Sequence, residues 1–472
     1  MTMPWRPRAA RAGVGVGLST LLLAVAATSL TAQQAAQQVA QRPAPARRSA
    51  AAAAPIPIVF VHGNGDHAGL WDNTIWRFES NGYPRDRLFA VDLPHPSASS
   101  TPTARESNRS TPEDQAAALA AFVTRVLLRT GATKVALVGS SRGGLTMRHY
   151  VRFGGGAAHV SHVITCGTPN HGVMALATMT PESEFNGLSP YLRALNAGSE
   201  VVAGVRFLAL RSDSLDKYAQ PTGAAMGAPT MATGVDARSP ALAGATNVVL
   251  PGTDHREVAF GAAAFAAQYR FIVGRPARTL AIVPDSAVVL DGMVSANAGG
   301  QPTNVPLARA LVTVHEVDAA SGVRTRVAVH RAVTRDDGRW GPFRASANAR
   351  YEFEVAMPDS SVILHLYRSS FPRSSAVVNF RLPAPPAPRR DSVSVLMTRP
   401  RGYLGASRDT VHFDGVPAAG ITPGVPTVDR ALRWFAADTA RTVRATINAE
   451  TIVVRTHPQD RRRLVVAEFQ QE

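Results

Sequence analysis

Between about residues 55 and 277, the chain alternates short apolar runs with stretches of helical periodicity. Apolar residues recur at helical spacing over 115–129 and 145–153. The apolar runs that we expect to form strands are Ile58–Val61, Leu88–Val91, Val135–Val138, Val160–Thr165, Val205–Leu210 and Asn247–Leu250. Strands that alternate with helices predict a mostly parallel sheet covered on both faces, so the expected fold class is α/β.

From residue 278 onward the pattern changes to an alternation of Val, Thr and aromatic residues, with short turns and no long helical stretch. This pattern is typical of β-sandwich or barrel modules. The proline-rich run 383–390 indicates a linker, which divides the region into 278–382 and 391–472. The sequence therefore predicts an α/β domain over 55–277 followed by two small all-β modules.

The N-terminal segment is typical of an export signal. Three arginines precede an apolar run over 14–27, and small residues at 26–32 offer a cleavage site, which predicts a signal peptide over 1–32. An uncleaved N-terminal anchor is the alternative, and no arginine pair precedes the run to favour twin-arginine export. Segment 33–54, rich in Gln, Ala, Pro and Arg, is a predicted low-complexity linker. We expect the protein to be secreted or to reside in the periplasm or cell envelope.

Composition places the chain among globular proteins. It has 472 residues, of which 45% are hydrophobic and 18% charged, which allows about three domains and excludes disordered and collagen-like classes. Lys and Arg total 50 against 34 acidic residues, a net charge of +16. The arginines are spread along the chain without a dense basic helix, which indicates a surface bias and not nucleic-acid binding. A weak attraction to anionic lipid or a cell-envelope surface stays open.

Cys166 is the only cysteine, so no intramolecular disulfide can form. It lies in an apolar run and is expected to be a small buried residue, not a reactive thiol. The sequence contains no cysteine pair and no His-x-x-x-His pattern, so we expect neither a metal site nor a cofactor.

A serine candidate for covalent chemistry stands at the end of the third apolar run. Gly139-Ser140-Ser141-Arg142-Gly143 has the G-x-S-x-G pattern between a predicted strand and a predicted helix. The turn that carries such a serine leaves no room for a Cβ two residues to either side. Glycines occupy both positions around Ser141, whereas Ser140 would be flanked by Val138 and Arg142. Ser141 is therefore the predicted nucleophile.

A base and an acid follow this serine in the chain. His255 lies in the turn Gly252-Thr253-Asp254-His255, after the last predicted strand, where an imidazole can return over the nucleophile. The acid is expected after the preceding strand, where Asp216 fits best and Asp213 is the alternative. Asp254 is adjacent to the histidine in sequence and poorly placed to orient it. The predicted catalytic residues are Ser141, Asp216 and His255.

The loop His62-Gly63-Asn64-Gly65 directly follows the first predicted strand. In folds with this serine turn, the loop at that position supplies one N–H of the oxyanion hole, and the residue after the nucleophile supplies the other. The backbone N–H groups of Asn64 and Arg142 are therefore the predicted oxyanion donors.

Together these segments resemble the secreted bacterial lipases of the α/β-hydrolase superfamily. The resemblance covers about residues 55–277, and the segments that carry it are 61–65, 139–143, 166–172, 212–221 and 252–255. Of these, Cys166-Gly167-Thr168-Pro169-Asn170-His171-Gly172 is similar to a Gly-Thr-Pro-containing run of such lipases. The resemblance implies a serine hydrolase of lipid-like acyl esters. Ser140 and Arg142 replace the residues that these lipases often carry beside the nucleophile, so the acyl-chain preference is not fixed.

The apolar stretch 173–202 stands where such lipases insert a lid. Either a mobile amphipathic lid or an extra packed helix pair fits this stretch.

The C-terminal half has a resemblance of its own. Segments 290–294, 305–314, 334–340 and 351–353 are similar to transthyretin-like sandwich modules. Some archaeal and bacterial lipases carry C-terminal β-domains that help bind lipid, and this tail resembles that arrangement. Four aromatic residues of the tail could form an apolar contact patch, although core packing is the favoured role. They are Trp340, Phe343, Tyr367 and Phe371.

We therefore expect a carboxylic ester hydrolase of lipase type, whose partner is a lipid or another ester substrate. One alternative is a polyester depolymerase or short-chain carboxylesterase with the same three catalytic residues. The other alternative is a non-catalytic protein that binds a surface through its β modules.

Overall fold

The computed structural model describes residues 54–225, 228–358, 360–383, 386–387, 389, 391–457 and 463–470. The chain divides into the units Met1–Ala54 and Pro55–Glu472, and the fold below is that of the second unit. The predicted signal peptide (1–32) and almost all of the predicted linker (33–54) lie outside the described residues, so both stay predictions. Among the helices of the described residues, we find none with the length and apolarity that a membrane crossing requires.

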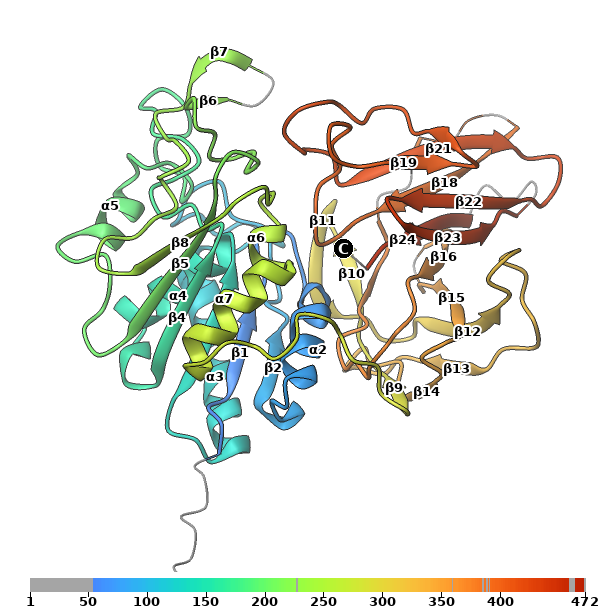
Figure 1. The fold of residues 1–472 in the computed structure, drawn as a ribbon, viewed down its shortest axis with the longest axis horizontal. Coiled ribbons are helices and arrows are strands. Elements are labelled where there is room, and N and C mark those ends of the chain that lie inside the picture. Colours follow the sequence, from blue (N-terminus) through green and yellow to red (C-terminus); the bar gives the residue numbers. More distant parts are fainter. Residues whose placement is uncertain are drawn as a thin grey trace, which may run out of the picture. The chain divides into compact units, whose positions relative to one another are not determined.

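The first half of this unit forms the expected parallel sheet (Figure 1). Its strands run in the order β2-β1-β3-β4-β5-β8, and every neighbouring pair is parallel. They are β1 (Ile58–Val61), β2 (Leu88–Val91), β3 (Val135–Ser140), β4 (Val160–Cys166), β5 (Arg206–Ser212) and β8 (Thr246–Leu250). Each of the six contains or overlaps a predicted apolar run, which confirms the α/β fold class.

Helices cover both faces of the sheet because the side chains of a strand alternate between its faces. Ile58 and Phe60 pack with residues of α2 and α7, whereas Val59 and Val61 pack with residues of α3 and α4. The helices are α2 (Asp72–Ser80), α3 (Pro112–Thr130), α4 (Arg142–Phe153), α5 (Pro190–Asn196), α6 (Glu257–Phe260) and α7 (Ala262–Val273). Short elements between them are η1 (Ala68–Trp71), η2 (Arg85–Arg87), η3 (Gly156–Ala158), β6 (Ala224–Ala225) and β7 (Ala228–Ala232).

The second half is built of strands, as predicted. The first group is β9 (Val288–Leu290), β10 (Val294–Ala298), β11 (Gln301–Pro306), β12 (Leu311–Val317), β13 (His330–Val333), β14 (Phe343–Ala345), β15 (Arg350–Ala356), β16 (Ile363–Arg368) and β17 (Phe380–Arg381). The second is β18 (Ser392–Thr398), β19 (Val411–Phe413), β20 (Val416–Pro417), β21 (Arg430–Ala436), β22 (Thr442–Ile447), β23 (Glu450–Arg455) and β24 (Arg463–Glu468).

One sheet joins the two predicted β modules. Within the described residues its order is β13-β12-β15-β16-β24-β18-β21, so four strands from before the predicted linker 383–390 lie beside three strands from after it. The junction between the two groups of strands is the parallel pair β16–β24. Whether 278–382 and 391–472 fold separately stays a prediction, but in this structure they share backbone hydrogen bonds along a common sheet.

The four tail aromatics are buried, which confirms their core role. Trp340, Phe343, Tyr367 and Phe371 are each at most 6% exposed, and they lie in the two apolar clusters of the C-terminal half.

Candidate active site

Ser141 lies in the sharp turn between β3 and α4. Its φ of 50° and ψ of −122° place it in a backbone conformation that non-glycine residues rarely adopt. A Cβ added at Gly143 would lie 2.5 Å from the carbonyl oxygen of His62, and one at Gly139 would lie 2.6 Å from Met147 Cε. The flanking glycines are therefore required by packing, as the sequence pattern indicates.

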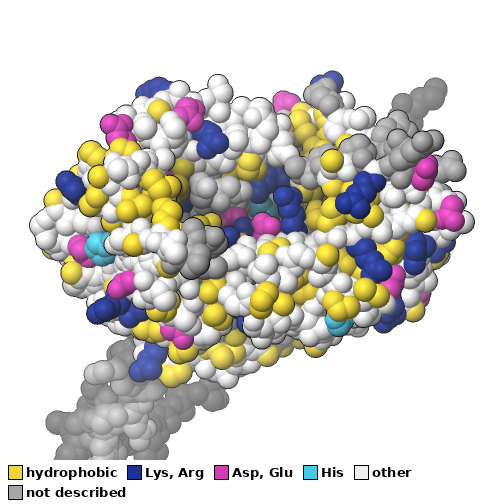
Figure 2. All heavy atoms as spheres, turned by 90° about the horizontal axis from the view of Figure 1, so that it is seen from above, with side chains coloured by type: hydrophobic (Ala, Val, Ile, Leu, Met, Phe, Trp, Pro, Cys, Tyr) yellow, Lys and Arg dark blue, Asp and Glu magenta, His cyan; other side chains and the backbone are white. Residues whose placement is uncertain are grey.

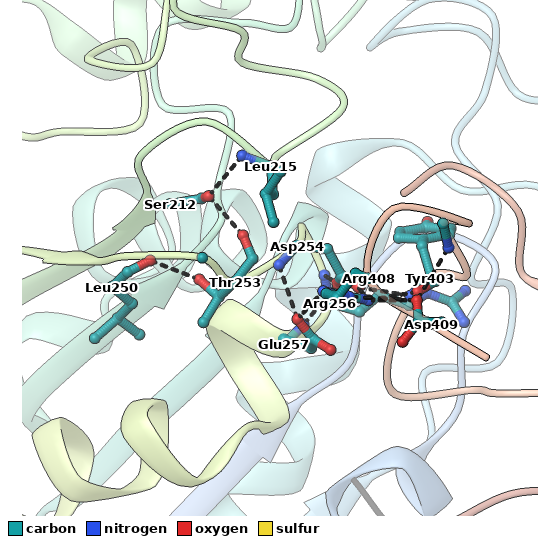
Figure 3. Close-up of polar contacts among 12 residues, drawn as sticks. Ser212, Leu215, Leu250, Thr253, Asp254, Arg256, Glu257, Tyr403, Arg408 and Asp409 are labelled. Atoms are coloured by element: carbon teal, nitrogen blue, oxygen red, sulfur yellow. Dashed lines mark hydrogen bonds and ion pairs between the residues drawn. The ribbon is translucent and has the colours of Figure 1, made fainter. Parts of the chain in front are cut away.

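His255 and Asp216 are in direct contact. His255 Nδ1 lies 2.9 Å from Asp216 Oδ2 and 3.0 Å from Oδ1, and both side chains are buried. The loops that carry them are also joined, because the Ser212 hydroxyl donates to the Thr253 carbonyl (2.6 Å) at the ends of β5 and β8 (Figure 3). A carboxylate on Nδ1 leaves Nε2 of the imidazole free for proton transfer.

The other two candidate carboxylates have different partners. Asp213 accepts the backbone N–H groups of Gly252 (3.1 Å) and Ser214 (2.6 Å). Asp254 is fully buried and accepts the N–H groups of Arg256 (2.8 Å) and Glu257 (2.9 Å) at the start of α6. Neither of these contacts is to the imidazole of His255.

Ser141 and His255 line the same cavity, whose volume is about 230 Å³. Its other lining residues are Asn64, Asp66, Ser140, Pro169, Val173, Phe185, Tyr218, Arg256 and Tyr403. The Tyr218 ring packs edge-on against His255 at 4.7 Å between ring centroids, and burial raises the pKa of the Tyr218 phenol. A surface view of the molecule shows a hollow in which basic, acidic and histidine side chains appear between areas of hydrophobic surface (Figure 2).

The predicted oxyanion loop lies against the nucleophile turn. A Cβ added at Gly63 would lie 3.2 Å from Ser141 Cβ, and the same loop brings Asn64 to the cavity. The neighbouring N–H of Gly65 is donated to the Pro96 carbonyl, and the Asn64 side chain accepts the Ala98 N–H at 2.8 Å. These bonds fix the loop, whose Asn64 lines the same cavity as Ser141. Arg142 follows Ser141 directly as the first residue of α4.

The side chain of Arg142 has a role that sequence reasoning missed. It is 2% exposed and donates to the Pro96 carbonyl, to Ser110 and to the carboxylate of Glu184. Burial raises the pKa of Glu184, and the Arg142 charge opposes that effect. The residue after the nucleophile thus ties the serine turn to two distant segments. An arginine next to the nucleophile and an acid in the following insertion are the only sequence signals for this pair.

Glu184 belongs to the stretch 173–202. The sequence of this stretch allows either a mobile lid or a packed helix pair. Its one described helix is α5, and the rest consists of turns around the buried side chain of Asn186, which donates to the carbonyls of Leu176 (2.7 Å) and Met179 (2.9 Å). The stretch is therefore not a helix pair. Whether it moves stays a prediction.

Residues of the C-terminal half brace the oxyanion loop, which sequence reasoning also missed. Asn304 donates to the carbonyls of Asp66 and Leu93 (both 3.0 Å) and contacts His62 Nε2 at 3.2 Å. Arg381 donates to the Gly65 carbonyl at 2.8 Å. These contacts cross more than two hundred residues of sequence, so no local pattern could have shown them.

One side-chain cluster of the described residues has metal-ligand chemistry. Glu352, His365 and His457 place their ligand atoms within 4.8 Å of one another. However, Arg324 donates to both oxygens of the Glu352 carboxylate (2.8 Å each), and Arg463 lies 2.9 Å from His365 Nε2. A cation would have to displace two guanidinium groups, so we assign no metal to this cluster.

Cys166 is fully buried and burial raises the pKa of its thiol to about 12, which confirms the prediction of an inert small residue.

The fold and the serine turn define an α/β hydrolase, and comparison with protein families agrees. Residues 56–196 match the alpha/beta hydrolase fold family, and residues 286–385 match the lipase C-terminal domain family. The chain thus combines an α/β-hydrolase domain with a lipase-type C-terminal domain, and it is a carboxylic ester hydrolase. The transthyretin-like likeness of the tail stays a prediction.

Solved structures with some similarity include one lipase in two forms and a phospholipase. The Bacillus licheniformis lipase BlEst2 in its propeptide form is 16% identical over 85% of this chain and 92% of its own, with a TM-score of 0.37. The mature form is 21% identical over 47% and 91%, with a TM-score of 0.33. Legionella pneumophila phospholipase PlaB is 14% identical over 69% and 93%, with a TM-score of 0.34.

Proposed function

We propose that the protein cleaves carboxylic esters, lipid-like ones in particular, through an acyl-enzyme on Ser141. The observation that carries this proposal is the buried contact of Asp216 with His255 Nδ1 beside a cavity that Ser141 also lines. The lipase C-terminal domain match and the resemblance of the catalytic half support a lipid-like substrate. The predicted export signal supports an enzyme that works outside the cytoplasm.

The reaction needs only groups of this chain. Ser141 Oγ attacks the ester carbonyl while His255 Nε2 takes the hydroxyl proton, and Asp216 stabilises the imidazolium. The N–H groups of Asn64 and Arg142 stabilise the oxyanion, the latter at the positive end of a helix. Collapse of the tetrahedral intermediate breaks the C–O bond, and the histidine returns its proton to the leaving alcohol. Water repeats both steps to release the acid.

The nucleophile is tested by labelling with a fluorophosphonate, which reacts with activated serines. We expect the native protein to be labelled and Ser141→Ala not to be, with Ser140→Ala as the matched control that still labels. Labelling that persists in Ser141→Ala would refute the assignment. Absence of labelling in the native protein would favour the non-catalytic, surface-binding alternative.

The size of the cavity favours a second candidate, a short-chain carboxylesterase or polyester depolymerase. Its volume of about 230 Å³ is below the roughly 300–1,000 Å³ that ligand pockets usually have, and charged residues stand at its edge. A panel of aryl esters of increasing acyl length, with and without an emulsified interface, decides between the candidates. Activity that peaks at two to four carbons with no interfacial response would overturn the lipase assignment.

A further inference from the structure

Tyr403 belongs to the C-terminal half, yet it lines the cavity of Ser141 and His255. It lies in the loop between β18 and β19, and its side chain is 6% exposed. The loop Arg399–Asp409 therefore forms part of the wall of this cavity. It is distant in sequence, since Tyr403 follows its partner Asp254 by 149 residues.

The ring of Tyr403 packs on the chain neighbours of both Asp216 and His255. Lys217, which follows Asp216, places Nζ 3.8 Å from the ring centroid, and Arg256, which follows His255, places Cζ at 5.1 Å. A cation over an aromatic face is attracted by the electron density of the ring, more strongly where water is excluded. Burial lowers the pKa of Lys217 and raises that of Tyr403, as expected of a partly dehydrated cluster.

A set of charged contacts holds this loop on the turn that carries His255 (Figure 3). Asp254 accepts the Tyr403 N–H at 2.7 Å and Arg408 Nη2 at 3.1 Å. Arg408 also reaches Glu257 at 2.6 Å, and Arg399 reaches the other oxygen of Glu257 at 2.7 Å. The carboxylate of Asp254 thus connects the Tyr403 loop to the start of α6. One oxygen accepts from the loop, and the other accepts the N–H groups of the two residues that follow His255.

A second cavity of about 400 Å³ adjoins the first one. Asp66 and Arg256 line both cavities and form an ion pair of 3.1 Å with each other. Arg256 is also held by the Pro400 carbonyl at 2.6 Å, in the same loop as Tyr403. A substrate group that outgrows the first cavity therefore meets the Tyr403 ring or the Asp66–Arg256 pair, and the second cavity lies beyond that pair.

We propose that the Arg399–Asp409 loop completes the catalytic cavity and that Tyr403 limits the size of the ester group that fits beside Ser141. The proposal rests on the proposed ester hydrolysis and adds to it a residue that sets substrate size. The C-terminal half then acts within the active site, in addition to any contact with lipid.

The test uses the full chain and two ester series, one of increasing acyl length and one of increasing alcohol length. We expect Tyr403→Ala to raise kcat/KM for long relative to short esters by roughly tenfold or more in at least one series, since a single methylene is commonly discriminated about tenfold. Tyr403→Trp should change the ratio in the opposite direction. Arg408→Ala, which frees the loop, should change it in the same direction as Tyr403→Ala.

Two variants serve as matched controls. Tyr351 has a similar exposure, 5%, but lies in β15 away from the cavity, so Tyr351→Ala should leave the ratio unchanged even if it destabilises the fold. Arg441 makes an exposed ion pair in the same half, so Arg441→Ala should also leave the ratio unchanged. Ratios of kcat/KM do not depend on how much enzyme is folded, which keeps the test valid for unstable variants.

The outcomes separate this proposal from the one on which it rests. If Tyr403→Ala and Arg408→Ala keep the native ratios in both series, the loop does not set substrate size and the inference is overturned. If the native chain neither cleaves the esters nor reacts with fluorophosphonate, the proposed function itself fails.

Discussion

At the scale of single residues, the acid of the proposed catalytic set is where the structure adds most to the sequence. Asp213 and Asp216 stand three positions apart after β5, and the local sequence favours Asp216 without excluding Asp213. In the structure Asp216 contacts His255 Nδ1, while Asp213 accepts backbone N–H groups. Only the path of the chain between β5 and β8 decides which carboxylate faces the imidazole.

We predict that Asp216→Asn lowers kcat by roughly 10³- to 10⁴-fold, because an amide on Nδ1 no longer holds the tautomer that takes the serine proton. Asp213→Asn should change kcat less than tenfold, and it is the matched control. Steady-state kinetics on a soluble aryl ester measure both. Equal losses in the two variants, or a larger loss in Asp213→Asn, would contradict the assignment of Asp216.

The serine turn was predictable to the residue, and the reason is steric. The pattern of glycines around Ser141 excludes Ser140 because the turn cannot hold a Cβ at either flanking position, and the distances at Gly139 and Gly143 show this crowding. The side chain of Arg142 was not predictable, since its partners Ser110 and Glu184 are brought to it only by the tertiary fold.

At the scale of elements, the stretch 173–202 is tied to the nucleophile turn by the buried ion pair of Arg142 with Glu184. Glu184 and Arg142 have side-chain exposures of 3% and 2%, so each depends on the other for charge compensation. If the stretch opened as a lid at Glu184, the ion pair between Arg142 and Glu184 would have to break. Motion, where it occurs, is expected at the exposed part of the stretch before Glu184.

We predict that Glu184→Ala destabilises the protein by about 3–5 kcal/mol, because it leaves the Arg142 guanidinium buried without a counter-charge. Glu182→Ala, at an exposed position two residues earlier, should change stability by less than about 0.5 kcal/mol. Urea unfolding midpoints measure the difference. Similar midpoints for Glu184→Ala and the native chain would show that the pair does not anchor the stretch.

The strands of the catalytic half could be predicted from apolar runs because both faces of a parallel sheet are buried, which makes each strand stand out in the sequence. The order of the C-terminal strands in their sheet could not be predicted from the sequence. Their alternating patterns are alike, and the parallel pairing of β16 and β24 joins residues about a hundred positions apart. Pairing over such separations is determined by packing, not by local sequence.

At the scale of the whole molecule, the C-terminal half supports the catalytic loops at two places, through Tyr403 and through Asn304 with Arg381. Arg381 acts on the oxyanion loop, since it donates to the carbonyl of Gly65, next to Asn64. We therefore regard it as a positioning residue. Its side chain is half-buried, and burial lowers the pKa of its guanidinium.

We predict that Arg381→Ala lowers kcat by roughly 10- to 100-fold with a smaller change in KM, because the oxyanion donor is needed mainly in the transition state and is misplaced when its loop shifts. Arg331→Ala, at an exposed position in β13, is the control and should leave both constants unchanged. A loss that appears only in KM would instead indicate a role in substrate binding.

The pH dependence of stability should originate in part from a buried cluster far from the catalytic loops. Glu352 is 1% exposed, and Arg324 and His365 donate to its carboxylate, with Glu354, Arg463 and His457 close by. Burial alone would raise the pKa of Glu352, but the hydrogen bonds of Arg324 and His365 outweigh it and hold the pKa well below its usual range. A carboxyl group whose pKa is lower in the folded chain stabilises the fold above its unfolded pKa of about 4.3, and this contribution is lost as the pH falls toward the folded value.

We predict that Arg324→Ala destabilises the protein by about 2 kcal/mol at pH 7, less than for a fully buried pair because the Arg324 side chain is 34% exposed. The difference from the native chain should shrink as the pH is lowered from about 5 toward 2, because protonated Glu352 no longer needs a counter-charge. Arg326→Ala, which removes the exposed neighbouring pair with Glu316, should cost less than about 1 kcal/mol at every pH. Urea unfolding at a series of pH values measures all three chains, and a constant difference between native and Arg324→Ala would show that Glu352 does not titrate as argued.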